Sequence, residues 1–485
     1  MSNPTKIYND YVRANLPSTM TFDSTTDRYD INNHSFLSFK EANWYFKYVT
    51  KYGYTSLSVY AVNNFDPDLV FDFKQNYYRT GGTATTLSSA VTHTRASSAT
   101  MTNSSGTLVT VGNNVARTGH HVYNGSAWVN EGILHESEAR TNLVTYSNDL
   151  NHSTWTKFRV VITQNVSGVT GPDGTQTVDK ITPIATNEQH RVWYGVSSTA
   201  VGETYSVYAK SAGYDYIWVG YYENPVYEYA IVNLTNGAVT SSNADNYSVE
   251  DVGNGFYRIS VTKTTSGSSR YISISPSPTA SPTLDTNSAP VYLGDGTSGV
   301  YVYGAQIEAG STPSSYIPTS GSTVTRAADT LTVPAANLPY SSTNMSIQID
   351  GRMTYADQDE FSAHQFMRWR ASGSDNIASA GGTNTGDGLR VLFQQVAGGV
   401  NDTIPTGVVY NEGILVPFNL SSRHGSTFIN GATDGTALTA DTTPVALPDL
   451  STTNLELGYD FMGTIAQFRM WDEDLGDTGI AEAST

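Results

Sequence analysis

The sequence predicts an all-β protein of tandem β-sandwiches, preceded by a small N-terminal α/β segment. Charged residues make up only 14% of the 485 residues, and helix surfaces need such residues, so helix cannot dominate. Thr, Tyr and Val suit pleated strands, while Gly, Asn, Asp and Ser suit the turns between them. A chain of this length exceeds one compact core, so several domains are expected.

Residues 1–64 differ from the rest because they contain a segment with a helical pattern. Ser38 and Glu41 have the spacing of a capping box. The aromatic residues that follow form a partial helical stripe: Trp44, Tyr45, Tyr48 and Tyr52. Two interpretations stay open. The helix packs on its own domain, or the stripe anchors the chain to another protein of an assembly.

Residues 65–142 have the pattern of short strands, and we expect them to form a β connector domain. Leu69, Phe71 and Phe73 alternate along one face, which predicts a half-buried strand. Asn124-Gly125 lies between two strand-like runs, HVY and SAWV, which predicts a two-residue hairpin turn.

Two longer regions each predict a sandwich. Residues 143–325 contain about eight strand candidates, including the runs FRVVITQ and YIWVGYY, separated by turns at sandwich spacing. Residues 326–485 contain further candidates, with strong turn signals at Asn430-Gly431 and Asp434-Gly435. The last ten residues, GDTGIAEAST, have the composition of a short polar tail.

The densest aromatic cluster of the chain lies between residues 214 and 229. Aromatic faces stack on sugar C–H surfaces, so the cluster is a candidate for glycan binding. The candidate residues are Tyr216, Trp218, Tyr222, Tyr227 and Tyr229. Tyr216, Trp218 and Tyr222 share one face of a strand, and the opposite face carries Ile217, Val219 and Tyr221. The alternative interpretation is that the rings pack in a core or a subunit interface.

Charge and cysteine content narrow the class of protein. The net charge of −18 repels nucleic acid, so we expect no nucleic-acid partner. The chain has no cysteine, which fits assembly in a reducing cytosol. We find neither a signal peptide nor a run apolar enough for membrane insertion.

Sequence patterns give little sign of metal or catalytic chemistry. Asp173 and Asp295 lie in Gly-rich turns, where a carboxylate forms the turn or helps to hold a structural calcium ion. We predict no cofactor, no other metal and no catalytic residue. A glycosidase needs two facing carboxylates, and several residues stay open as such a pair: Glu136, Glu138, Asp215, Glu223 and Glu228. Arg140 and Arg326 flank the central sandwich and are interpreted as linker-packing residues.

Several motifs in fixed order resemble the tail-fibre, head-fibre and spike proteins of tailed bacteriophages. They span about half of the chain and occupy residues 92–117, 132–150, 171–182, 205–213, 251–262 and 301–329. The central region resembles a carbohydrate-binding-module jelly roll. The C-terminal region resembles a laminin-G or concanavalin-like sandwich, with Phe428-Ile429-Asn430-Gly431 and the closing run GTIAQFRMWDEDL.

The resemblance implies a non-enzymatic structural protein of the virion that adheres to the host surface. It implies synthesis in the host bacterial cytoplasm and attachment to portal, tail or capsid proteins, for which residues 1–64 are the candidate segment. We also expect a homo-oligomer, with a trimer favoured, because clustering strengthens weak glycan contacts. The alternatives are a capsule-degrading tailspike and a cellular adhesin or lectin.

Overall fold

A computed structural model describes most of the chain from residue 58 to residue 485. The gaps are residues 197–201, 224–225, 265–269, 356–363 and 384–387. Three N-terminal strands form a separate antiparallel sheet: β1 (Thr21–Asp23), β2 (Arg28–Ile31) and β3 (His34–Phe36). The predicted helix with Trp44, Tyr45, Tyr48 and Tyr52 lies outside the described residues. Antiparallel strands dominate the described chain, which confirms the all-β class.

The larger sheet of the C-terminal sandwich has ten strands. Its order is β37-β36-β35-β30-β39-β4-β5-β6, with β11 also paired to β39 and β10 paired to β11. The strands are β4 (Leu69–Asp72), β5 (Tyr77–Thr80), β6 (Thr83–Thr85), β10 (Arg117–Tyr123), β11 (Trp128–Glu136), β30 (Asn344–Tyr355), β35 (Gly413–Gly425), β36 (Ile429–Thr433), β37 (Thr436–Ala437) and β39 (Met462–Trp471).

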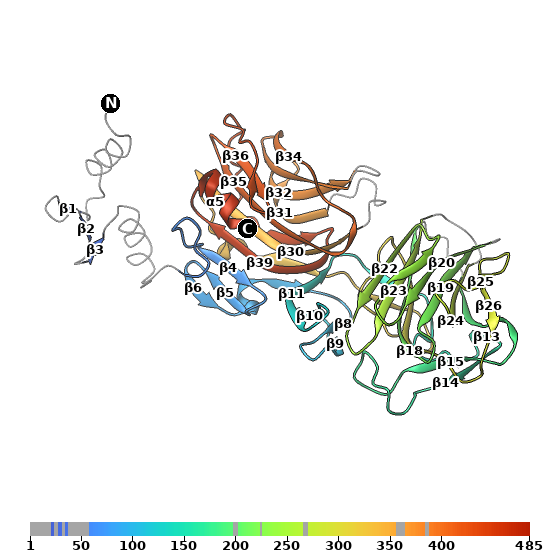
Figure 1. Cartoon of the computed structure of the whole chain (residues 1–485). Coiled ribbons are helices and arrows are strands. Elements are labelled where there is room, and N and C mark those ends of the chain that lie inside the picture. The colour runs from blue at the N-terminus through green and yellow to red at the C-terminus, as the bar shows by residue number, and fades with distance from the viewer. Residues whose placement is uncertain are drawn as a thin grey trace.

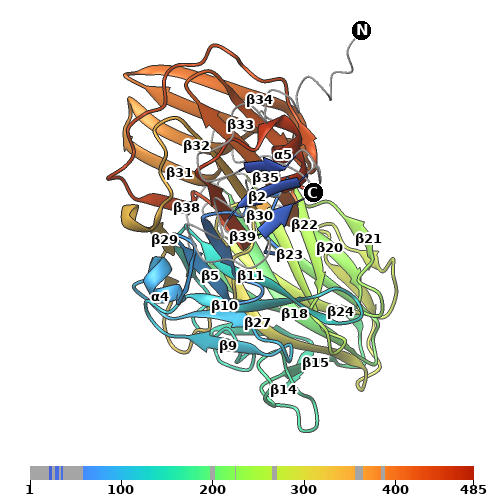
Figure 2. The same ribbon diagram turned by 90° about the vertical axis from the view of Figure 1, so that its left-hand side faces the viewer.

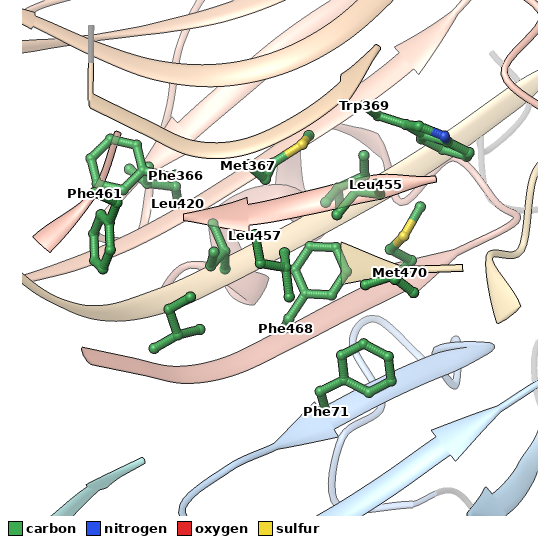
Figure 3. Packing of buried hydrophobic residues seen from close by; sticks show 14 of the residues in the cluster. Phe71, Phe366, Met367, Trp369, Leu420, Leu455, Leu457, Phe461, Phe468 and Met470 are labelled. Carbon is green, nitrogen blue, oxygen red and sulfur yellow. The ribbon is translucent and has the colours of Figure 1, made fainter. Parts of the chain in front are cut away.

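The facing sheet has seven strands in the order β34-β33-β32-β31-β38-β29-β7. They are β7 (Thr92–Thr94), β29 (Thr330–Val333), β31 (His364–Ser372), β32 (Asp375–Thr383), β33 (Leu389–Ala397), β34 (Val400–Tyr410) and β38 (Leu455–Tyr459). Apolar side chains from both sheets fill the space between them, among them Phe71, Trp369 and Phe468 (Figure 3). The rings of Phe71 and Phe468 have centroids 6.1 Å apart.

Residues 65–142 do not form the separate connector that we expected. β4 pairs with β39, β11 also pairs with β39, and β7 pairs with β29, so the segment completes both sheets of the C-terminal sandwich. Short strands cannot bury both of their faces alone, and they gain this burial by pairing with long strands from the end of the chain. The second sandwich therefore draws on residues 65–142 as well as 326–485.

The central sandwich consists of two six-stranded sheets. The first has the order β13 (Trp155–Phe158), β17 (Arg191–Val196), β24 (Arg270–Ser277), β19 (Tyr216–Glu223), β20 (Val226–Asn233) and β21 (Val239–Ser242). The second has the order β14 (Val160–Thr163), β15 (Asp179–Pro183), β27 (Gly299–Ala309), β18 (Glu203–Ala212), β23 (Tyr257–Lys263) and β22 (Asn246–Asp251). Both sheets lie within residues 143–325, where the sequence predicts a sandwich.

The expected single strand FRVVITQ is divided between the two sheets. Arg159 adopts a positive φ of 56°, and the chain passes there from β13 in one sheet to β14 in the other. A left-handed residue reverses the local direction of an extended chain, and apolar alternation in the sequence does not report it.

Smaller elements complete the fold. They are the hairpin β8 (Ala99–Thr102) and β9 (Leu108–Val111), the pair β12 (Arg140–Asn142) and β28 (Val324–Arg326), the sheet β16 (Asn187–Gln189), β26 (Pro290–Leu293) and β25 (Thr283–Leu284), and the helices α4 (Leu87–Ala90), η2 (Ala335–Asn337) and α5 (Gly476–Ala483). No helix in the described ranges is long and apolar enough to cross a membrane.

The last ten residues are not the polar tail that we expected. Most of them form α5, which buries Ile480 and Ala483 against Trp471 and Leu475. One apolar side chain per turn is enough to hold this short helix, although its Gly and Thr residues disfavour helix in isolation.

The two sandwiches lie side by side, with β8 to β11 between them (Figure 1). After a 90° turn, β31 to β35 occupy the upper part of the molecule, and the central strands β18 to β24 lie below (Figure 2).

Candidate functional site

A buried cluster of charged side chains joins the two sandwiches. Arg95 donates to Asp329 at 3.0 Å, and Arg117 bridges Asp329 and Glu136, the latter at 2.7 Å. Arg326 Nε lies 3.2 Å from Glu136. All five residues are at most 3% exposed. Three cations and two anions from distant parts of the chain thus compensate one another in the interior, as buried charges must.

Hydrogen bonds tie this junction cluster to both modules. Ser315 donates to Glu136 through its backbone N–H at 2.7 Å and its hydroxyl at 2.6 Å. Arg326 also donates to the Glu138 carbonyl at 2.7 Å, and Arg140 donates to the Ala309 carbonyl. These contacts confirm the interpretation of Arg140 and Arg326 as linker-packing residues.

The junction cluster holds its carboxylates in the charged form. Burial by itself would raise the pKa of Glu136, but the charges of Arg326 and Arg117 outweigh it and lower that pKa to about 2. Burial opposes ionisation of Asp329 in the same way. The hydrogen bond to His93 and the charge of Arg117 nevertheless hold the pKa of Asp329 well below its usual range.

The predicted aromatic cluster is divided between buried rings and a half-buried margin. Trp218 is 0% exposed, and Tyr227 and Tyr229 are also buried, whereas Tyr216 and Tyr222 are half-buried. The rings fill a small second core with Ala289 and Leu284, under the segment that carries β25 and β26.

Burial changes the role of the central ring in this cluster. Trp218 has no exposed surface for a sugar, so it packs as a core residue. Glycan contact at Tyr216 and Tyr222 stays a prediction. The opposite face of β19 carries Ile217, Val219 and Tyr221 into the main core, as the alternation predicts.

The two candidate calcium residues cap their own turns. Asp173 accepts hydrogen bonds from Thr175 and Thr177, and Asp295 accepts from the backbone N–H groups of Thr297 and Ser298. Within the described ranges, no group of three His, Asp or Glu side chains could hold a metal ion.

Most of the carboxylates considered for glycoside hydrolysis have structural partners. Glu136 belongs to the junction cluster, Glu138 pairs with Arg140 at 2.6 Å, and Glu228 pairs with Lys263. Asp215 accepts a hydrogen bond from the Ser211 hydroxyl at 2.8 Å. The side chain of Glu223 lies outside the described residues. Glu136 and Glu138 therefore serve packing at the junction.

A cavity of about 320 Å³ lies beside the junction cluster, between the two sandwiches. Its floor includes a row across three neighbouring strands of the central sandwich: Glu250 on β22, Arg258 on β23 and Tyr208 on β18. One wall is the β10–β11 hairpin. The C-terminal sandwich supplies a third side, which includes Arg352, Thr354 and Met462.

A β-bulge brings two consecutive histidines to this junction cavity. The register between β10 and β11 shifts on both sides of His120, and His120 and His121 both line the cavity. His120 Nδ1 accepts a hydrogen bond from the Thr102 N–H at 3.3 Å. His121 Nδ1 lies 2.8 Å from the Gly119 carbonyl and donates to it. Burial lowers the pKa of His120 to about 3, so its imidazole is neutral at neutral pH.

An aromatic pair lines part of the junction cavity. Trp128 and Tyr123 line it, with ring centroids 5.2 Å apart. A Cβ atom added at Gly106 would lie 2.2 Å from the Trp128 ring, and one at Gly253 would lie 2.5 Å from it. Glycine at these two turns therefore allows Trp128 to sit against the central sandwich.

The junction cavity was not predicted from the sequence. Its residues come from widely separated stretches of chain, from Thr100 to Gly463, and meet only in the folded protein. The sequence holds one indirect sign of the cavity. Several of its lining residues fall in or beside the motifs of the phage-like resemblance: Gly106, His120, Asp251 and Ser315.

The fold and junction define a tandem β-sandwich protein. No family model and no curated protein matches the chain. Among solved structures, the chain is similar to the CBM40 module of a Ruminococcus gnavus IT-sialidase, at 14% identity and a TM-score of 0.24, over 30% of this chain and 84% of that chain.

Two further solved structures show a comparable extent of similarity. The botulinum neurotoxin serotype D binding domain aligns at 11% identity and a TM-score of 0.25, over 32% of this chain and 39% of that chain. A heptameric SAP-like pentraxin from Limulus polyphemus aligns at 8% identity and a TM-score of 0.23, over 30% and 70% of the respective chains. Similarity of this extent carries no inference about a ligand.

Proposed function

We propose that this chain is a structural component of a bacteriophage virion, a fibre- or spike-like appendage that adheres to glycans on the host surface. The observation that carries the proposal is where the phage-like motifs lie in the fold. Residues 92–117 supply Arg95 and Arg117, residues 132–150 supply Glu136, and residues 301–329 supply Asp329. Motifs far apart in sequence that meet at one buried junction support a shared architecture.

The proposed assembly assigns each region a part. Residues 1–64 attach the chain to portal, tail or capsid proteins, and the two sandwiches project toward the host. A homotrimer presents three copies of each module, which raises avidity through effective concentration. The proposed appendage is made in the host bacterial cytoplasm, binds no nucleic acid, and catalyses no reaction.

Labelling of phage particles tests the virion role. An antibody raised against the purified chain should mark a fixed position on particles in electron micrographs. Particles made with a chain that lacks residues 1–64 should lose the label, while the truncated chain remains folded. Unlabelled wild-type particles would contradict the proposal.

A competition assay tests adhesion separately. Purified chain should slow adsorption of the phage to its host by occupying surface glycans, and heat-denatured chain should not. The same preparation, applied to purified capsule polysaccharide, should leave the polymer length unchanged. Shortening of the polymer would favour the capsule-degrading alternative instead.

A further inference from the structure

The junction cavity presents polar groups that the fold itself does not use. The Glu250 carboxylate lines the cavity and is half-buried. It lies opposite Arg258 on the neighbouring strand, whose charge attracts it, but it accepts no hydrogen bond from any residue that the structure describes. Burial raises the pKa of Glu250, which is the cost of holding a carboxylate there. An unused acceptor in a sheltered site is suited to a ligand that donates hydrogen bonds.

The two histidines add a donor and a second ring nitrogen. Nδ1 of His120 accepts a backbone hydrogen bond, so its ring proton is on Nε2 and can be donated. Nδ1 of His121 donates to the Gly119 carbonyl, so its Nε2 is the ring nitrogen that remains for a ligand. A sugar hydroxyl both donates and accepts, and this alternation of donors and acceptors matches it.

The aromatic pair supplies the apolar half of such a site. Trp128 and Tyr123 line the same cavity as His120 and Glu250. Aromatic faces cover the C–H surface of a sugar ring while the polar groups take its hydroxyls. The volume of about 320 Å³ lies at the lower end of the about 300–1,000 Å³ of small-molecule sites, so it suits one sugar unit.

The balance of charge selects among sugars. Arg352 pairs with Glu131 at 2.9 Å, and the positive charge of Arg258 lies opposite Glu250 while its guanidinium also donates to the Ser314 carbonyl at 2.6 Å. Glu250 and Asp251 add two carboxylates to the lining. Glu136 of the junction cluster also lines the cavity, so a sialic or uronic acid would bring a fourth carboxylate, and like charges repel in a sheltered site.

We propose that the junction cavity binds a single neutral sugar unit, a hexose or an N-acetylhexosamine, of a host-surface glycan. This inference rests on the proposed adhesive function and names its site. Glu250 and the imidazoles of His120 and His121 hold the hydroxyls, and Trp128 with Tyr123 covers the ring. Because both sandwiches form the site, binding also depends on the junction cluster that holds them together.

Sugar binding by the full chain tests the inference. The probes are glucose, galactose, N-acetylglucosamine, N-acetylgalactosamine and, as the acidic sugar, N-acetylneuraminic acid, followed by saturation-transfer NMR and titration. Glu250→Gln should weaken binding of the preferred neutral sugar about tenfold or more, because it removes hydrogen bonds to a charged acceptor. The matched control is Glu188→Gln, an exposed carboxylate paired with Arg159 on the surface. It should bind as the wild type does.

A second variant shows whether any loss of sugar binding arises from the cavity or from a folding defect. Val122→Phe adds volume at the cavity wall and should abolish binding, while the melting temperatures of both variants report their folding. Unchanged binding by Glu250→Gln and Val122→Phe, with loss in a Tyr216→Ala/Tyr222→Ala chain, would overturn the site and leave glycan adhesion intact. Stronger binding of N-acetylneuraminic acid would overturn the choice of a neutral sugar.

The remaining outcomes separate this inference from the function on which it rests. If none of the probes binds but the purified chain still slows phage adsorption, the cavity site is wrong and adhesion stands. If no probe binds and adsorption is also unaffected, the adhesive function fails together with the site.

Discussion

The junction cluster and the aromatic cluster are both buried, yet they are built from opposite materials. The junction places three arginines and two carboxylates in the interior, where each is at most 3% exposed. The aromatic cluster places Trp218, Tyr227 and Tyr229 under a loop, at 0%, 3% and 8% exposure. The stretch that is most conspicuous for its aromatic residues thus forms an ordinary core. Arginines that are scattered along the sequence instead form the cluster that joins the two sandwiches.

The difference lies in what each cluster requires of its surroundings. Aromatic rings gain free energy from burial in any well-packed arrangement. A buried ion pair gains little net free energy, because desolvation offsets the attraction, but removal of one partner is costly. The ion pairs of the junction cluster therefore form in only one relative placement of their strands. For this reason the cluster fixes the two sandwiches against each other.

Removal of a junction carboxylate should have the largest effect. Asp329→Ala leaves Arg95 and Arg117 without a buried counter-charge, and we expect a loss at the upper end of about 3–5 kcal/mol in the free energy of unfolding. Urea denaturation measures it. The control Asp449→Ala removes an exposed carboxylate that accepts hydrogen bonds from Ser451, and it should shift the midpoint far less than Asp329→Ala. A loss below about 1 kcal/mol for Asp329→Ala would show that the junction does not hold the modules.

Removal of the central ring of the aromatic cluster should come next. Trp218 contacts Tyr227 and Tyr229, with ring centroids 5.0 and 5.9 Å away. Trp218→Ala should destabilise the chain by about 3 kcal/mol, because a cavity replaces a large buried side chain. Thermal unfolding measures it. Weakened glycan binding by a variant of unchanged stability would contradict the core role.

Acid should weaken the junction before it weakens the aromatic core. The pKa of Glu136 is about 2 in the folded chain and near 4.5 when unfolded, so its contribution is fully present above about pH 5. It is lost as the pH falls from about 4.5 toward about 2, and we expect a decline of about 2–3 kcal/mol. Denaturation at a series of pH values measures it.

The variant Glu136→Gln separates the loss of stability caused by protonation of Glu136 from the effects of other carboxylates. Burial raises the pKa of Asp179 to about 6, which has the opposite sign: stability rises as the pH falls through about 6. Glu136→Gln should therefore flatten the decline below pH 4.5 and leave the Asp179 effect in place. An unchanged acid profile in Glu136→Gln would assign the decline to other groups.

Truncation at the margin of the aromatic cluster should have the smallest effect. Tyr216 is half-buried and packs against the edge of the small core. Tyr216→Ala should cost about 1 kcal/mol, less than Trp218→Ala, since part of the Tyr216 side chain remains exposed to solvent. Thermal unfolding of Tyr216→Ala and Trp218→Ala, measured side by side, compares the two losses of stability. Equal losses in the two variants would show that the cluster has no exposed margin.

Local patterns predicted much of the secondary structure but little of the pairing. The alternation of Ile217, Val219 and Tyr221 gives the inner face of β19, and Asn124-Gly125 lies in the hairpin between β10 and β11. The turn spans four residues, since Tyr123 pairs with Trp128. The pairing of β4 with β39 joins residues about 400 positions apart, and no local periodicity carries that information.

The candidate sites follow the same division. The aromatic residues between 214 and 229 are conspicuous in the sequence, but their burial depends on a loop more than fifty residues further along the chain. The junction cavity escaped prediction because each of its walls is unremarkable by itself. Only the roles of Arg140 and Arg326 were predicted at the junction, because both flank the central sandwich.

The sequence by itself determined the all-β class, the central sandwich and the inward faces of its strands, because residue type and alternation act over a few neighbours. The tertiary structure decided which distant strands complete each sheet, which charges meet at the junction, and where a cavity remains between the modules. These outcomes depend on contacts between residues hundreds of positions apart, where the free energy of packing and charge pairing, rather than local preference, selects the arrangement.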